Sequence, residues 1–171
     1  PGCRIRERRS SELASPDLSV VERRMQPGAW DSGGFLAPGS SLADVLARDA
    51  DTVRRIGMDL RVIGERLQEL LRAGEGSDVF QPTAIGDYEV EVLHQRGLIT
   101  CPWAPEEGES CPLGQGARPT ANRFIIRHRP TGNRIEGFEL SVHLIRDHGF
   151  LGGPETRFRI NPESLVSVLG P

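Results

Sequence analysis

Lysine is absent from this chain, and cysteine, histidine and aromatic residues are scarce. The 171 residues include three cysteines and four histidines, and aromatic side chains make up 5% of the total. All 21 basic residues are arginine, which we interpret as a genomic bias in composition. With a net charge of −3, the chain is not a polycation that coats nucleic acid nonspecifically. The few aromatic residues also argue against nucleic-acid binding by base stacking.

Long apolar runs are missing as well. No stretch approaches the roughly 18 consecutive apolar residues of a membrane-spanning helix, and no apolar block follows the arginine-rich start as it would in a secretory signal. The sequence contains no P-loop, GxSxG or HExxH motif and no dinucleotide-binding fingerprint. We therefore expect a cytoplasmic protein that has no membrane segment and lacks these catalytic signatures.

The first 40 residues are rich in arginine, glycine and proline. Residues 1–24 carry six arginines and few large apolar side chains, which predicts a flexible, solvated arm; an arm that contacts phosphates is the alternative. Residues 26–40 form a Gly/Pro-rich connector, for which we predict no secondary structure. Three apolar side chains of the connector could dock on the body of the protein: Trp30, Phe35 and Leu36.

A regular apolar repeat begins after the connector and predicts a long amphipathic helix over residues 41–74, ended by Gly74. At 1.5 Å per residue this helix is about 50 Å long, too long to bury its apolar seam against one small domain. We therefore expect a homodimer or a helical partner protein. The seam recurs at steps of four and three residues with one acidic interruption: Leu42, Leu46, Asp49, Val53, Ile56, Leu60, Ile63, Leu67 and Leu70.

Two glycines inside this repeat allow a different interpretation. Gly57 and Gly64 could break the helix and give a helix-turn-helix within residues 41–72, in which Asp59 caps a recognition-like second helix. However, both glycines continue a stripe of small residues spaced seven apart, after Ala43 and Ala50. A stripe of this kind lets another backbone approach closely, so we favour the continuous helix.

Residues 78–171 alternate between strand-like and helix-like patterns, which predicts a small mixed α+β domain. Together with the preceding helix, this gives an α+β fold class. The predicted elements are a strand over 88–92, a short extended segment over 98–101, a β-hairpin of 123–129 and 134–138, a helix over 139–148, an edge strand over 156–160 and a C-terminal helix that starts at Asn161.

Four of the seven cysteine and histidine residues fall into two pairs in this domain. Cys101 and Cys111 precede the hairpin, and His143 and His148 lie on the helix after it. Two thiolates and two imidazoles are a common ligand set for structural Zn²⁺, so we predict a zinc-stabilised domain. The spacing between the cysteines differs from that of common zinc fingers, and histidines five apart on a helix point about 140° apart.

Other interpretations of the four residues remain open. Cys101 and Cys111 could form a disulfide, which would leave Cys3 over, or they could be ordinary buried thiols. A zinc-dependent hydrolase is a further alternative and would need an open coordination position and a carboxylate base. Asp147 flanks the histidines and could be that base, an acceptor for an imidazole N–H outside the ligand shell, or a solvated residue at the end of the helix.

Charge is unevenly distributed along the domain. Residues 75–111 contain eight acids and one arginine, whereas residues 112–159 contain eight arginines and four acids. The arginines of the hairpin could contact phosphates or an acidic partner, or could pair with the acidic segment of the same chain: Arg123, Arg127, Arg129 and Arg134. The sequence thus favours a non-enzymatic zinc-binding interaction or regulatory protein, with a nucleic-acid-binding protein as the main alternative.

Overall fold

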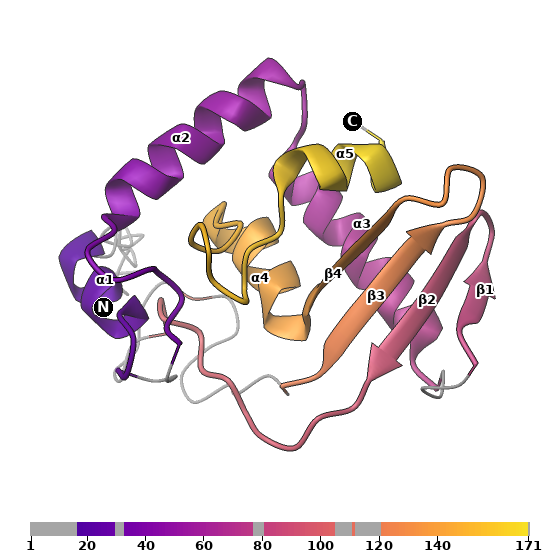
Figure 1. Cartoon of the computed structure of the whole chain (residues 1–171), viewed down its shortest axis with the longest axis horizontal. Helices are drawn as coiled ribbons and strands as arrows, with labels where there is room; N and C mark the ends of the chain where they lie inside the picture. Colours follow the sequence, from indigo (N-terminus) through magenta and orange to yellow (C-terminus); the bar gives the residue numbers. More distant parts are fainter. Residues whose placement is uncertain (1–16, 30–32, 77–80, 105–110, 112–120, 171) are drawn as a thin grey trace, which may run out of the picture.

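The computed structural model describes residues 17–29, 33–76, 81–104, 111 and 121–170. This part of the chain contains five helices and a four-stranded antiparallel sheet, which confirms the mixed α+β class (Figure 1). None of the described helices is long and apolar enough to cross a membrane. The elements are α1 (Leu18–Met25), α2 (Leu42–Arg55), α3 (Leu60–Gly74), β1 (Thr83–Ile85), β2 (Tyr88–Leu93), β3 (Arg123–His128), β4 (Arg134–Phe138), α4 (Glu139–His148) and α5 (Pro162–Leu169).

The sheet is a meander in which each strand pairs with the next one along the chain. Val90 of β2 lies opposite Ile126 of β3, and Ile126 lies opposite Ile135 of β4. Because side chains alternate along a strand, these residues share one buried face. The predicted hairpin is confirmed, and Gly132 in its turn takes the left-handed conformation, with φ at +73°.

Helices α3 and α5 cover the buried face of the sheet (Figure 1). Gly74 at the end of α3 lies so close to the sheet that an added Cβ would be 2.6 Å from Cγ1 of Val90. Helix α4 packs along α3. Together these elements form an apolar cluster that we call the sheet core: Met58, Ile63, Leu67, Leu70, Val90, Val92, Phe124, Ile126, Ile135, Val142, Ile145, Leu151, Ile160, Leu165, Val168 and Leu169.

The predicted continuous helix over residues 41–74 is wrong. Helix α2 ends at Arg55, Gly57 takes a left-handed φ of +68°, and the Asp59 side chain accepts from the first backbone amides of α3. The start of the apolar repeat and its end lie in different cores of the same chain. Leu42 packs in a second cluster, described below, whereas Val53 and Ile56 near the end of α2 pack against the sheet core together with α3. The repeat is therefore buried largely within one chain, so its length does not require a partner helix.

A second apolar cluster, which we call the cysteine core, joins the N-terminal segment to α4 and the following loop. Its members are Val21, Met25, Phe35, Leu36, Leu42, Val45, Cys101, Trp103, Ala104, Cys111, Phe138, Leu140, Leu144, Phe150 and Phe158. The docking predicted for Phe35 and Leu36 is thus observed, with both side chains fully buried. Trp30 lies outside the described residues.

Helix α1 differs from the flexible, solvated arm that the sequence predicted over residues 1–24. Asp17 caps the helix, and Val21 and Met25, one turn apart, bury their side chains in the cysteine core. The Glu22 side chain accepts a hydrogen bond of 2.7 Å from the backbone amide of Leu42. These contacts tie α1 to the start of α2, so residues 17–25 are not a solvated arm.

The predicted edge strand over residues 156–160 does not form, and residues 98–101 contribute only an isolated bridge residue, Leu98. Instead, the loop after α4 folds back on itself, because the amide of Ile160 donates to the carbonyl of Leu151 at 2.8 Å. Arg159 turns inward and forms a two-point ion pair with Asp49 of α2, with N–O distances of 2.6 and 2.8 Å. This ion pair explains the acidic interruption of the apolar repeat.

Candidate metal centre

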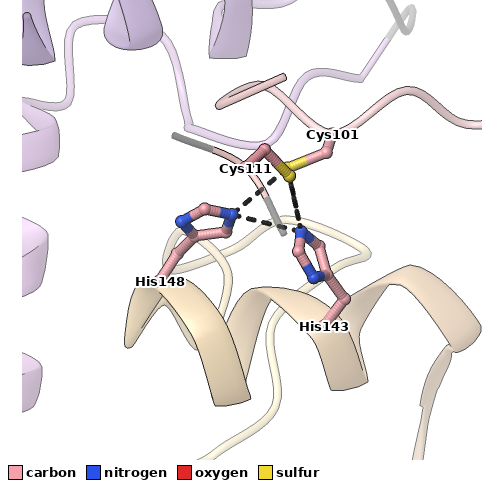
Figure 2. A group of neighbouring side chains, drawn as sticks. All are labelled: Cys101, Cys111, His143 and His148. Carbon is pink, nitrogen blue, oxygen red and sulfur yellow. Dashed lines mark hydrogen bonds between the residues drawn. The ribbon is translucent and has the colours of Figure 1, made fainter. Parts of the chain in front are cut away.

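Two segments of the chain bring the four predicted ligands together. Cys101 and Cys111 lie on the connection between β2 and β3, and His143 and His148 project from α4 toward them (Figure 2). Their ligand atoms all lie within 4.8 Å of one another, so the group could bind one metal ion. Cys101, Cys111 and His143 are buried, and His148 is half-buried.

The distances between the ligand atoms suit tetrahedral coordination. With bonds of about 2.3 Å to sulfur and about 2.0–2.1 Å to nitrogen, a tetrahedral zinc ion separates neighbouring ligand atoms by about 3.3–3.8 Å. The Nε2 atom of His143 lies 3.3 Å from each of the two sulfur atoms. The Nε2 atom of His148 lies 3.5 Å from Sγ of Cys101 and 3.1 Å from Nε2 of His143. These four separations lie close to the tetrahedral values, and all six separations in the group are within 4.8 Å.

Helix α4 presents two histidines that lie five residues apart to one candidate metal site. The helix stays regular through His148 and ends at Gly149, whose φ of +63° lies in the left-handed region. The two rings meet edge to face, with centroids 4.8 Å apart, and their Nε2 atoms point toward each other and toward the cysteines (Figure 2). The difference of about 140° in direction is therefore accommodated without any unwinding of the helix before His148.

Aromatic and arginine contacts fix the loop that carries Cys101. The Trp103 indole stacks on the His148 ring with centroids 4.5 Å apart and planes 5° apart. The Arg24 guanidinium of α1 donates to the carbonyl oxygens of Pro102 and Ala104 at 3.3 and 3.2 Å. The sequence analysis missed Trp103 and Arg24 as neighbours of the site, although an aromatic residue two positions after a candidate ligand was a visible signal.

Asp147 contacts His143 as the sequence analysis proposed. One of its carboxylate oxygens, Oδ2, lies 2.6 Å from Nδ1 of His143, on the side of the ring away from the sulfur atoms. Burial raises the pKa of Asp147, but hydrogen bonds from Arg146 and His143 outweigh this effect and hold the pKa below its ordinary value. The ionised carboxylate can therefore accept the Nδ1 proton, which leaves the Nε2 lone pair for a metal ion.

The two cysteines are free thiols in the structure. A hydrogen bond with Cys111, together with burial, raises the pKa of the Cys101 thiol. Without a cation, two sulfur atoms this close do not both ionise. A divalent metal ion supplies the charge that stabilises both thiolates. Cys3, the third cysteine, lies outside the described residues.

The arginines of the hairpin contact acceptors of the same sheet. Arg123 lies 3.5 Å from a carboxylate oxygen of Glu136, and Arg127 lies 3.8 Å from one of Glu89, which belongs to the acidic segment 75–111. Arg129 donates to the carbonyl oxygen of Gly86, and Arg134, on β4, is exposed. These contacts agree with pairing inside the chain, and the sheet surface carries both signs of charge.

Comparisons with known proteins add no functional information. No protein-family model, curated protein or solved structure matches this chain. The functional argument therefore rests on the chemistry of the four clustered side chains and their surroundings.

Proposed function

We propose that the protein is a non-enzymatic zinc-binding protein in which Zn²⁺ is a structural ion held by Cys101, Cys111, His143 and His148. The observation that carries this proposal is the convergence of two thiols and two imidazole Nε2 atoms within 4.8 Å, three of the residues being buried. Thiolate and imidazole together are the typical donors of structural zinc sites, whereas magnesium and calcium prefer oxygen donors.

Four protein ligands favour a structural ion over a catalytic one. A catalytic zinc keeps one position open for water or substrate, and a site completed by both cysteines and both histidines has none. Glu139, a candidate general base, lies on the first turn of α4 and accepts a hydrogen bond of 3.3 Å from the Asn122 side-chain amide. The hydrolase alternative therefore has less support than the structural ion.

The ion would strengthen the connection between parts of the fold that the cysteine core already joins. Its cysteines lie in the cysteine core with α1 and α2, and its histidines lie on α4, which also packs on α3. Because the ligands are up to 47 residues apart in sequence, metal binding would stabilise the folded chain selectively. This is a role in stability, and it needs no substrate.

An interaction role is proposed for the groove between α2 and the start of α3. The groove has a volume of about 570 Å³ and an apolar wall that continues the repeat seen in the sequence. Because the rest of the apolar repeat is buried within the chain, a second copy or a helical partner would bind in this groove. The lining includes Leu46, Ala50, Val53, Met58 and Leu60.

Native mass spectrometry of the full chain tests both parts of the proposal. We expect one zinc per chain, lost on treatment with a chelator and reduced well below one equivalent in Cys111→Ser and in His148→Ala, which keep three of the four ligands. His94→Ala is the control, because His94 is exposed and lies outside the cluster, and it should retain one zinc. Zinc bound equally by all four proteins would contradict the site, and a monomeric mass at every concentration would contradict self-association.

A further inference from the structure

Helices α3 and α4 touch at a point that only glycine allows. A Cβ added at Gly64 of α3 would lie 2.5 Å from Cβ of Arg146 of α4, so the two helices approach more closely than side chains normally permit. Gln68 follows Gly64 by one helical turn and therefore faces the same neighbour. The close approach of the two helices brings the Gln68 side chain of α3 next to Arg146 of α4.

A continuous line of polar contacts leads from this point to the ligand cluster. The Gln68 side-chain oxygen accepts a hydrogen bond from Nη1 of Arg146. The same guanidinium donates from Nε to Oδ1 of Asp147 at 2.9 Å and from Nη2 to Oδ2 at 2.5 Å. Asp147 Oδ2 in turn lies 2.6 Å from Nδ1 of His143. The Arg146 guanidinium thus contacts Gln68 on one side and Asp147 on the other, and its two hydrogen bonds fix the orientation of the Asp147 carboxylate.

We propose that Arg146 and Gln68 are positioning residues of the metal centre, which set the orientation and tautomer of His143 through Asp147. The inference rests on the proposed function, because it gives these residues a part in binding zinc. It extends that function to α3, an element that supplies no ligand.

The physical reason lies in the two nitrogen atoms of an imidazole. A neutral ring carries its proton on one nitrogen, and only the other nitrogen can bind a metal ion. A fixed, ionised acceptor at Nδ1 keeps the proton there and aims the Nε2 lone pair at the cluster. Asp147 is a good acceptor only while its two oxygens are oriented, and the two-point contact with Arg146 prevents their rotation. Gln68 limits the freedom of the arginine in the same way.

The test compares zinc affinity among variants of the full chain, measured by competition with a chromogenic chelator. Arg146→Met removes the two-point contact, and Gln68→Leu removes the acceptor for Arg146. Gln68→Glu keeps an oxygen acceptor in the same place and is the conservative rescue. Arg72→Met is the matched control. Arg72 lies one turn beyond Gln68 on α3, and both line a cavity next to Arg146, but the hydrogen bonds to Asp147 come from Arg146.

We expect Arg146→Met and Gln68→Leu to weaken zinc binding by about tenfold, at the lower end of the 10–100-fold range for such supporting residues, while Gln68→Glu and Arg72→Met retain the wild-type affinity. A second readout is the ¹⁵N NMR signature of His143 in the zinc-saturated protein. Wild type should show only the Nδ1–H tautomer, and Arg146→Met should show a weakened or exchanging Nδ1–H signal. A purely structural role for Arg146 would not change this signature at saturating zinc.

Two results would overturn the inference in distinguishable ways. If the wild type binds zinc and Arg146→Met keeps both its affinity and its Nδ1–H signal, the positioning role is wrong and the metal site stands. If the wild type binds no zinc, the proposed function fails, and the positioning role fails with it. If Arg146→Met does not fold, the Gln68→Leu and Gln68→Glu pair decides the question alone.

Discussion

Removing the proposed zinc ion should lower the thermal stability of this protein by an amount that mass action allows us to estimate. The four proposed ligands are spread over 47 residues of sequence, so the unfolded chain has no assembled site and the proposed zinc ion would bind the folded state almost exclusively. The experiment therefore compares the melting temperature of the protein in a chelator with its melting temperature in a defined excess of free zinc.

The magnitude follows from mass action. At a free zinc concentration 100 times the dissociation constant, the folded state gains about 2.7 kcal/mol. For a chain of this size, 1 kcal/mol shifts the melting temperature by about 2–4 °C. We therefore expect the chelator to lower the melting temperature by about 5–11 °C, with a further increase in the shift at higher zinc.

Circular dichroism at several zinc concentrations measures this shift, with Cys111→Ser and His94→Ala run in parallel. In Cys111→Ser the zinc-dependent rise in melting temperature should be mostly lost, because only three of the four proposed ligands remain. His94→Ala should respond to zinc like the wild type. An identical melting temperature with zinc and with chelator would refute the reasoning. So would a Cys111→Ser protein that gains as much stability from zinc as the wild type does.

Three further changes test the packing around the site. Asp49→Ala leaves the half-buried guanidinium of Arg159 without a counter-charge and should cost about 1–3 kcal/mol in urea unfolding; a cost below about 0.5 kcal/mol would contradict a stabilising ion pair. Gly64→Ala should destabilise by about 1–3 kcal/mol, because the new methyl group would overlap Arg146, whereas in an exposed helix the same change would stabilise. Hydrogen bonds from Ser19 lower the pKa of Asp17, so its cap on α1 is complete above about pH 4 and is lost as the pH falls through its lower folded value. Amide exchange of α1 should show this loss, and Asp17→Asn should abolish it.

The features that the sequence predicts correctly are those set by local chemistry. The hairpin of β3 and β4 follows from strand alternation and a turn around Gly132, and α5 follows from Asn161 as its cap. The candidate ligands Cys101 and His143 could be found because so few thiols and imidazoles exist in the chain. Their convergence needed no knowledge of the fold beyond the order of the elements.

The features that the sequence predicts incorrectly depend on contacts between distant segments. The heptad pattern from Leu42 to Leu70 has a single polar interruption, Asp49, but burying its start in the cysteine core and its end in the sheet core outweighs the continuity of one helix. Alternation over residues 156–160 is typical of a strand, yet Arg159 faces inward because Asp49, 110 residues away, provides its partner. The role of Gln68 had no sequence signal at all, since it exists only where α3 meets α4.

X-ray absorption at the zinc edge tests the central claim most directly, because it measures the ligand shell itself. The account predicts a four-coordinate ion with two sulfur atoms at about 2.3 Å and two nitrogen atoms at about 2.0–2.1 Å, and the loss of one sulfur atom from the shell in Cys111→Ser. A shell of nitrogen and oxygen atoms alone, or one that Cys111→Ser leaves unchanged, would contradict it.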